Sequence, residues 1–286
     1  MFPLFSLSRN RQPGYPIQPD WDNRFTKGLL VLSMPAIAPI NVVNNMALSP
    51  LNSPTFATGR LGKGLSVIAG DSSSFEYVLS TYRNLQYAQS GLIVCRPTAS
   101  AGVFERLFNI KRVENASHQF SYFQRNDYSA GSFSEFQFGW GNFSHWNNSC
   151  THRFEAFSHP SVISFSSRYS ADSTAMYANG KKAAVFSTAV TADGATYYTP
   201  EKLSLGKLYY EGSTFFGTWH EIALVALWDE ILTDQQHFQL HQNPWQLFEP
   251  EVQFGFKASA AGITGPLIGA RRLIYGGPLI GGRLAA

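Results

Sequence analysis

The feature that most constrains this chain is a run of short strand-like segments between Leu65 and Pro250, with turn signals of glycine, proline or asparagine between several of them. Apolar and polar residues alternate in several of them, for example at residues 133–138. Such alternation turns one face of a strand inward and the other outward. Aromatic residues make up 15% and charged residues 14% of the 286 residues. This composition suits pleated, half-buried surfaces and predicts an all-β fold.

The predicted strands share apolar runs or period-two alternation and are bounded by turn signals. They lie at residues 29–32, 65–69, 91–97, 104–110, 119–123, 133–138, 162–166, 174–178, 181–185, 202–206 and 218–228. Asn179 and Gly180 predict a tight hairpin turn, because both tolerate a positive φ. The prolines between residues 35 and 54 predict a long irregular loop. One helix is expected, with Thr233 as its N-cap, Phe238 and Leu240 on its apolar side, and its end at residues 243–244.

A series of short motifs follows the later strands. In chain order these are Tyr-x-Asn-Gly at 177–180, Leu-x-Leu-Gly at 203–206, Phe-x-Gly at 215–217, an aliphatic strand ending in Trp228, Leu-Thr at 232–233 and Asn-Pro-Trp at 243–245. This order resembles the laminin-G-like members of the concanavalin A-like sandwich group. The ending at 243–250 is similar to that of such domains in tailed-bacteriophage structural proteins. The resemblance covers residues 60–250 and implies a jelly-roll β-sandwich.

Three parts of the chain differ in composition. Residues 1–28 are proline-containing and without periodicity, which predicts an extended N-terminal arm; residues 29–250 form the predicted sandwich. Residues 251–286 form a Gly/Pro-rich tail in which Gly-Pro-Leu-Ile-Gly occurs twice, twelve residues apart. Such a tail cannot build its own core, so we expect neighbouring chains to cover it. The predicted anchoring residues are Pro266, Leu267, Ile268, Arg271, Arg272, Pro278, Leu279, Ile280 and Arg283.

The distribution of charge argues against some partners. Acidic and basic residues balance up to Pro250, and the net charge of +3 arises in the tail. A body without a basic stripe is a poor match for nucleic acid. No apolar run approaches the length of a membrane span, and the first residues lack the pattern of a secretory signal. We therefore expect neither nucleic-acid binding nor membrane insertion.

Enzymatic motifs are incomplete. Glycoside hydrolases of related sandwiches need two or more acids on one strand, but Glu221 is followed by Ala223 and Val225. His220 and Glu221 match half of a zinc motif whose second histidine is replaced by Leu224. No Gly-x-Ser-x-Gly elbow is present. We predict a non-enzymatic protein.

Cofactor sites are equally sparse. Calcium is conceivable, as in laminin-G-like domains, through the predicted loop acids Asp71, Asp127, Asp172 and Asp193, but these form no dense cluster, and we expect no cofactor. Cys95 and Cys150 could pair only if the fold brings them together, and two buried thiols are the favoured prediction.

An aromatic and amide-rich segment at residues 138–148 is the most suggestive surface feature. Rings stack on sugar faces, and amide and imidazole groups bond hydroxyls, yet the same residue types favour protein interfaces. Its predicted contact residues, for a glycan or a subunit, are Trp140, Asn142, His145, Trp146 and Asn147.

Two functions remain. The first is a bacteriophage virion structural protein, displayed on the capsid or tail, anchored to coat or tail subunits by its terminal segments and assembled as a homo-oligomer, with a trimer preferred. The alternative is a glycan-binding adhesin module that contacts host surface carbohydrate through the aromatic loop.

Overall fold

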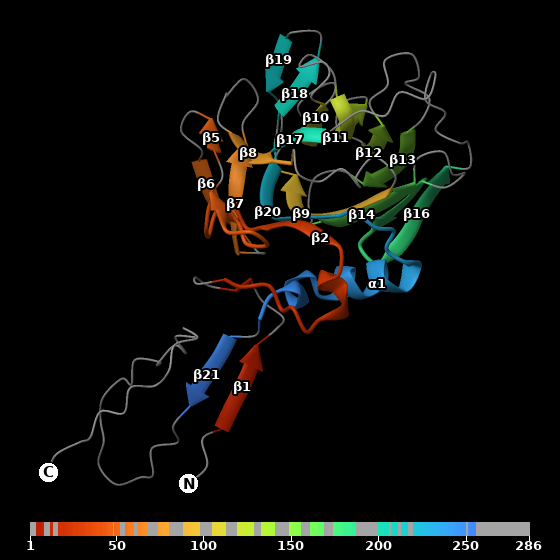
Figure 1. The fold of residues 1–286 in the computed structure, drawn as a ribbon. Coiled ribbons are helices and arrows are strands. Elements are labelled where there is room, and N and C mark those ends of the chain that lie inside the picture. Colours follow the sequence, from red (N-terminus) through yellow and green to blue (C-terminus); the bar gives the residue numbers. More distant parts are fainter. Residues whose placement is uncertain are drawn as a thin grey trace, which may run out of the picture.

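In the computed structural model, two antiparallel sheets stack face to face, and a layer of helix and irregular chain covers one of them (Figure 1). The structure describes residues 4–8, 12–13, 17–47, 49–51, 55–59, 62–67, 74–79, 88–97, 105–112, 119–128, 133–140, 149–155, 161–168, 174–186, 200–205, 207–210, 213–216, 220–249 and 251–255. The prediction of an all-β sandwich is confirmed.

The first sheet has seven strands. Their order across the sheet is β13 (Ser149–Glu155), β12 (Phe133–Trp140), β11 (Gln119–Tyr128), β10 (Glu105–Arg112), β17 (Pro200–Leu205), β8 (Ser74–Val78) and β5 (Ser49–Leu51). A hairpin, β18 (Lys207–Tyr210) with β19 (Ser213–Phe216), follows β17 directly and rises beside β10 (Figure 1).

The second sheet has eight strands. Seven of them run in the order β16 (Lys181–Phe186), β15 (Thr174–Ala178), β14 (Ser161–Arg168), β9 (Ala88–Pro97), β20 (His220–Trp228), β7 (Gly62–Val67) and β6 (Thr55–Gly59), and β2 (Leu29–Ser33) pairs with β20 beside this path. Asn179 and Gly180 have φ values of 46° and 81°, which confirms the predicted turn between β15 and β16.

The inner faces of the two sheets form the main core. It combines alternate residues of the facing strands, such as Phe108 and Ile110 with Ile163 and Phe165. The rings of Phe108 and Phe165 lie 5.7 Å apart between centroids. Gly91 leaves room for the Phe165 ring, because a Cβ at this position would lie 2.4 Å from it. Alternation therefore assigns the residues between these to the outer faces.

A second core covers the outer face of the eight-stranded sheet. Leu92, Val94 and Trp228 on this face pack with Leu240 and Leu247 of the helical layer. The Trp228 indole donates a 2.7 Å hydrogen bond to the carbonyl of Phe25, in the predicted arm. Because β9 and β20 are covered on both sides, their sequences are apolar without alternation, unlike those of the seven-stranded sheet.

The helical layer contains α1 (Asp234–Gln242) and two 3-10 turns, η1 (Arg24–Thr26) and η4 (Pro244–Leu247). Thr233 caps α1 as predicted: its hydroxyl accepts from the backbone N–H of Gln236, and the Gln236 side chain accepts from the Thr233 backbone. The buried side chains of α1 are His237, Leu240 and His241. Phe238 is half-buried, and its ring lies edge-on to Tyr177 with centroids 6.0 Å apart.

The segment at 35–54 is more regular than expected. Two short strands, β3 (Ile40–Asn41) and β4 (Met46–Ala47), pair there, and β5 joins the seven-stranded sheet. The side chain of Asn41 orders this segment: its oxygen accepts from the backbone N–H groups of Leu32 and Val43, and its nitrogen donates to the carbonyl of Leu30.

The two ends of the chain leave the sandwich together. Backbone bonds join Asp20 to Leu247 and Glu249 to Gln18, and beyond them β1 (Leu4–Ser8) pairs with β21 (Glu251–Gly255). Figure 1 shows this ribbon projecting from the side of the helical layer. Residues 256–286, the rest of the predicted tail, lie outside the described residues.

Candidate functional site

The predicted contact loop lies almost wholly outside the described residues. Trp140 ends β12, where its backbone pairs with Ser121; Asn142, His145, Trp146 and Asn147 fall in the part of the chain that is not described. The anchoring residues of the tail also lie outside it: Pro266, Leu267, Ile268, Arg271, Arg272, Pro278, Leu279, Ile280 and Arg283. Both sets of residues stay predictions.

The remaining predicted candidates are scattered. Asp127 lies within β11, not in a loop, because this strand continues to Tyr128; Asp71, Asp172 and Asp193 lie outside the described residues. No group of three or more His, Cys, Asp or Glu side chains able to hold a metal occurs in the part of the chain that the structure describes. Cys95 is buried in the main core and forms no disulfide, as favoured from the sequence.

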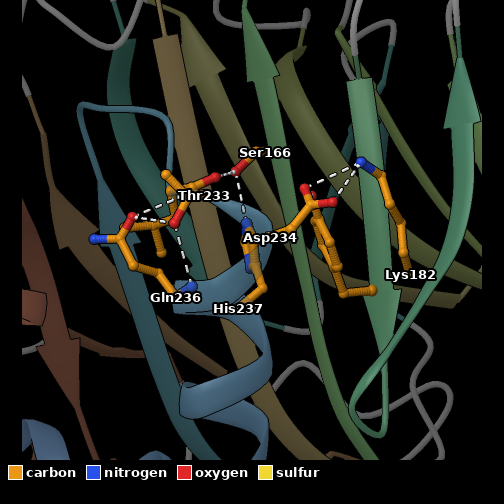
Figure 2. Close-up of polar contacts among 8 residues, drawn as sticks. Ser166, Lys182, Thr233, Asp234, Gln236 and His237 are labelled. Carbon is orange, nitrogen blue, oxygen red and sulfur yellow. Dashed lines mark hydrogen bonds and ion pairs between the residues drawn. The ribbon is translucent and has the colours of Figure 1, made fainter.

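The outer face of the eight-stranded sheet carries a hydrogen-bonded chain of serines and histidines beneath α1. Figure 2 shows the bond in it between His237 and Ser166. The Gly180 N–H donates to His241 Nδ1 at 2.9 Å, so the proton of the neutral His241 ring is on Nε2. This Nε2 donates to Ser164 Oγ at 2.7 Å. The Ser164 hydroxyl then donates to His237 Nδ1, also at 2.7 Å. His237 therefore carries its proton on Nε2 and donates to Ser166 Oγ at 2.7 Å.

The chain ends on backbone groups. Ser166 Oγ lies 2.7 Å from Ser90 Oγ and 3.2 Å from the Leu232 carbonyl, so its proton has two acceptors within reach. Ser90 donates to the Glu230 carbonyl at 2.7 Å and accepts from the Leu232 N–H at 3.0 Å. Each buried polar group of this serine–histidine chain thus has a partner, as native interiors require.

Burial sets the charge of the two histidines. The pKa of His237 is lowered to about 3, mainly by desolvation and secondly by electrostatic repulsion from the nearby His241. Desolvation lowers the pKa of His241 to about 4. Both rings are neutral at pH 7, and the hydrogen-bond directions derived above require this. Protonation of His237 at Nδ1 would deprive the Ser164 hydroxyl of its acceptor.

The serine–histidine chain places a hydroxyl beside a base, yet it is not a nucleophilic centre. Ser164 is 1% exposed and His237 0% exposed, so a substrate carbonyl has no access to the hydroxyl. Asp234 does not orient either ring by a hydrogen bond; it accepts from the Tyr177 hydroxyl at 2.6 Å and from Lys182 at 2.9 Å (Figure 2). These two donors lower the pKa of Asp234. The arrangement fastens α1 to the sheet.

Tyr177 completes this contact. Its ring stacks on His237 with centroids 3.9 Å apart, and it is itself buried. Sequence reasoning treated the histidines as scattered and missed their role. The signal was present: His237 and His241 are four apart on a helix, and Ser164 and Ser166 are two apart on a strand, so each pair shares one face.

The outer face of the seven-stranded sheet carries a row of polar positions. The registers place Glu76, Ser204, Asn109, Tyr122 and Gly139 side by side on β8, β17, β10, β11 and β12. Alternation puts Glu76, Ser204 and Asn109 on the face opposite the core residues of β8, β17 and β10. We call it the polar row.

Its central residue is unlike any in the serine–histidine chain. Asn109 is 0% exposed, yet neither atom of its amide has a hydrogen-bond partner among the described residues. Such a buried group costs about 1 to 3 kcal/mol. Ser204 beside it is also 0% exposed, and its hydroxyl lies 3.4 Å from Oε1 of Glu76. The Glu76 carboxylate is buried as well, with Lys202 Nζ at 3.5 Å from Oε2.

The polar row supplies donors and acceptors of several kinds. The amide of Asn109 can donate and accept, the Ser204 hydroxyl can do both, and the Glu76 carboxylate accepts. Sequence analysis placed Asn109 on an outward face through the alternation of residues 104–110, but nothing in the sequence signalled that this amide is covered and unpartnered. The polar row is the second cluster of buried polar side chains that the fold brings together.

Solved structures share the fold at low sequence identity. Trypanosoma rangeli sialidase, in complex with a difluorinated nononic acid, matches 76% of this chain with a TM-score of 0.55 at 12% identity. The binding domain of botulinum neurotoxin DC, in complex with SialylT, matches 76% with a TM-score of 0.53 at 9% identity. Domain 4 of AbnA, an extracellular arabinanase of Geobacillus stearothermophilus, in complex with arabinotriose, matches 74% with a TM-score of 0.51 at 14% identity.

The extent of these matches differs. The chain spans 33% of the sialidase and 51% of the neurotoxin binding domain, but 98% of the arabinanase domain. No family model matches the sequence, and no curated protein matches it. Among the described residues, α1 included, no helix has the length and apolar surface needed to cross a membrane. The likeness to solved structures is one of fold.

Proposed function

We propose that this chain is a non-enzymatic carbohydrate-binding β-sandwich module. The observation that supports the proposal is the shared fold, because two solved domains matched with TM-scores of 0.53 and 0.51 are complexes, one with SialylT and one with arabinotriose. Ligand sites of this kind combine shaped surface with a small number of polar groups that fix orientation.

One further point supports this function. The described residues offer no reactive centre open to a substrate, since the serine next to a histidine is buried. The predicted contact segment at residues 138–148, rich in aromatic and amide groups, begins within β12.

Binding and catalysis can be separated in one experiment. The full chain is titrated with lactose, arabinotriose and sialyllactose by calorimetry and saturation-transfer NMR, and each mixture is assayed for released sugar. The expected result is saturable binding of at least one glycan without release. Release of sugar would contradict the non-enzymatic part of the proposal, and the absence of any binding would contradict the function.

A second function, display on a bacteriophage particle, is favoured by the terminal ribbon. The pairing of β1 with β21 brings both ends of the chain to one place, and residues 256–286 begin at its outer end. Apolar residues Phe5 and Leu7 stand opposite Phe254 and Val252 in this register, and a two-stranded ribbon alone is marginally stable in water. Contacts with coat or tail subunits, or with further copies in a trimer, would stabilise it.

Deletion of residues 260–286 tests this second function. The shortened chain should fold with an unchanged melting temperature, yet be missing from particles assembled in its presence, as measured by mass spectrometry of purified particles. Light scattering of the full chain reports whether it is a trimer. Unchanged incorporation would contradict anchoring by the tail.

A further inference from the structure

We propose that Trp21 is the stacking platform of a sugar-binding site on the helical layer, and that its ligand is a pyranose. This inference rests on the proposed function and adds to it the place of binding, the residues and the class of sugar. Its starting point is the exposure of Trp21. This residue is 57% exposed, whereas Trp228 and Trp245 are buried in the second core.

The backbone around Trp21 is anchored on both sides. Before it, the Asp20 N–H donates to the carbonyl of Leu247 at 2.9 Å. After it, the Asn23 side chain donates to the carbonyl of Gln246 at 2.7 Å. A turn joins these anchors, because the Asn23 N–H donates to the Asp20 carbonyl at 2.9 Å and places Trp21 at the first corner. Trp21 therefore stands on a fixed base, and little backbone entropy remains to be lost when a ligand binds.

The exposed indole has the chemistry of a platform for a sugar. Its face is flat and apolar, and the C–H groups on one side of a pyranose form a flat apolar face that stacks on it. The indole N–H of Trp21 has no partner among the described residues, unlike that of Trp228, which donates to the Phe25 carbonyl. This N–H lies at the edge of the ring, so it is available to a hydroxyl of the neighbouring sugar unit.

Two glutamine side chains next to this turn supply further hydrogen-bonding groups. Gln239 Oε1 accepts from Arg24 at 2.5 Å, and Gln246 Nε2 donates to the Gln239 carbonyl at 2.9 Å. These bonds fix the orientation of both amides. With respect to the described residues, Gln239 keeps its nitrogen as a donor and Gln246 its oxygen as an acceptor. Both side chains are half-buried, so they are held in place and still reachable by sugar hydroxyls.

The surroundings of Trp21 favour a sugar over a protein partner. The exposed residues that follow it in the chain are polar, namely Asp22, Arg24 and Lys27. One ring among polar groups offers a small apolar area, which is enough to cover a sugar ring. A stable protein interface buries about 1,600 Å² and has an apolar centre.

The test titrates the full chain with lactose, sialyllactose and arabinotriose. The first two consist of pyranose rings, whereas the units of arabinotriose from arabinan are five-membered rings with a smaller flat face. At least one pyranose probe should bind, and more tightly than arabinotriose. Trp21→Ala should weaken binding of that probe by about tenfold or more, because the stacking surface is lost.

A matched control and a second readout keep the test decisive. Phe56, on β6 at the edge of the eight-stranded sheet, is 51% exposed, and Phe56→Ala should leave binding unchanged. Gln246→Met, a change of similar size, should weaken binding severalfold, and melting curves establish folding for each variant. In the parent, the bound probe should also protect tryptophan fluorescence from quenching by acrylamide. This protection should be absent from Trp21→Phe, which keeps a ring for stacking but not the indole.

The outcomes separate this inference from the function on which it rests. If no probe binds, the proposed function is wrong and this inference falls with it. If a probe binds equally to the parent and to Trp21→Ala, the module binds sugar elsewhere, and only this inference is overturned. A preference for arabinotriose over both pyranose probes would overturn the class of sugar.

Discussion

The outer faces of the two sheets differ in whether their buried polar side chains have hydrogen-bond partners. Beneath α1, Ser164, His237 and His241 satisfy one another through hydrogen bonds of 2.7 Å. On the seven-stranded sheet, Asn109 is just as buried and has no partner among the described residues. A polar group that folding leaves unpaired costs stability, whereas a paired one fixes the packing of its neighbours. The polar groups of the first face therefore stabilise the packing of α1, whereas the second face leaves the Asn109 amide unpaired among the described residues at a cost in stability.

The largest expected effect comes from removing His237, the central side chain beneath α1 on the eight-stranded sheet. His237→Ala removes a fully buried ring, its stacking on Tyr177 and two hydrogen bonds, and should lower the free energy of unfolding by about 3 to 5 kcal/mol. Chemical denaturation monitored by tryptophan fluorescence measures this loss. A loss below about 1 kcal/mol would show that the serine–histidine chain does not stabilise α1.

The second largest effect is expected from acid, which should weaken the packing of α1 on the eight-stranded sheet. The folded-state pKa values of His237 and His241, about 3 and about 4, lie below the ordinary value of 6.5, so the unfolded state binds more protons as pH falls. The free energy of unfolding should be highest above pH 6.5, fall progressively toward pH 4 and level off near pH 3. The total loss should be about a few kcal/mol. Denaturant unfolding at a series of pH values measures the profile.

The pH profile also has a variant control. Asn109→Val leaves both histidines in place and should show the same decline. His241→Gln removes one titrating group and should flatten it. A profile that is equally steep in His241→Gln would assign the acid sensitivity to other groups.

Removal of the N-cap of α1 should lower the free energy of unfolding by less than the two preceding changes. Thr233→Ala deletes the hydroxyl that accepts from Gln236 N–H and should lower the free energy of unfolding by about 1 kcal/mol. The pH profile should keep its shape, because the histidines remain seated. A changed profile would mean that the cap, and not the serine–histidine chain, positions α1.

The smallest effect on stability is expected from the exposed ion pair between α1 and the sheet. Lys182 and Asp234 form an exposed ion pair at 2.9 Å, and such pairs contribute little. Lys182→Ala should change the free energy of unfolding by less than about 0.5 kcal/mol. A larger loss would indicate that the Asp234 contact, with Tyr177, is a main attachment of α1.

The sequence predicted the sandwich because its strands obey simple local rules. Alternation marked the seven-stranded sheet, Asn179 and Gly180 marked a turn, and Thr233 marked the start of α1. The register shift between Arg106 and Phe108, where β10 pairs with β11, was not predicted, because local alternation does not mark it.

The candidate sites were harder to predict. The role of His237 depends on the buried serines of β14, which no local pattern on α1 reveals. Asn109 carries no local signal, since an outward asparagine in a strand is ordinarily exposed. What distinguishes it is the absence of a partner among the described residues of the folded chain, which sequence alone does not reveal.

Two buried asparagines provide the most direct test of the comparison. Asn41 is 3% exposed and uses both atoms of its amide, while Asn109 is 0% exposed and uses neither with the described residues. The measurement is the free energy of unfolding of Asn41→Val and Asn109→Val against the parent, by denaturation without ligand. We predict a loss of about 2 kcal/mol or more for Asn41→Val, and no loss or a gain of up to about 1 kcal/mol for Asn109→Val. Equal losses in the two variants would contradict the account, because they would mean that Asn109 is held by the fold as Asn41 is.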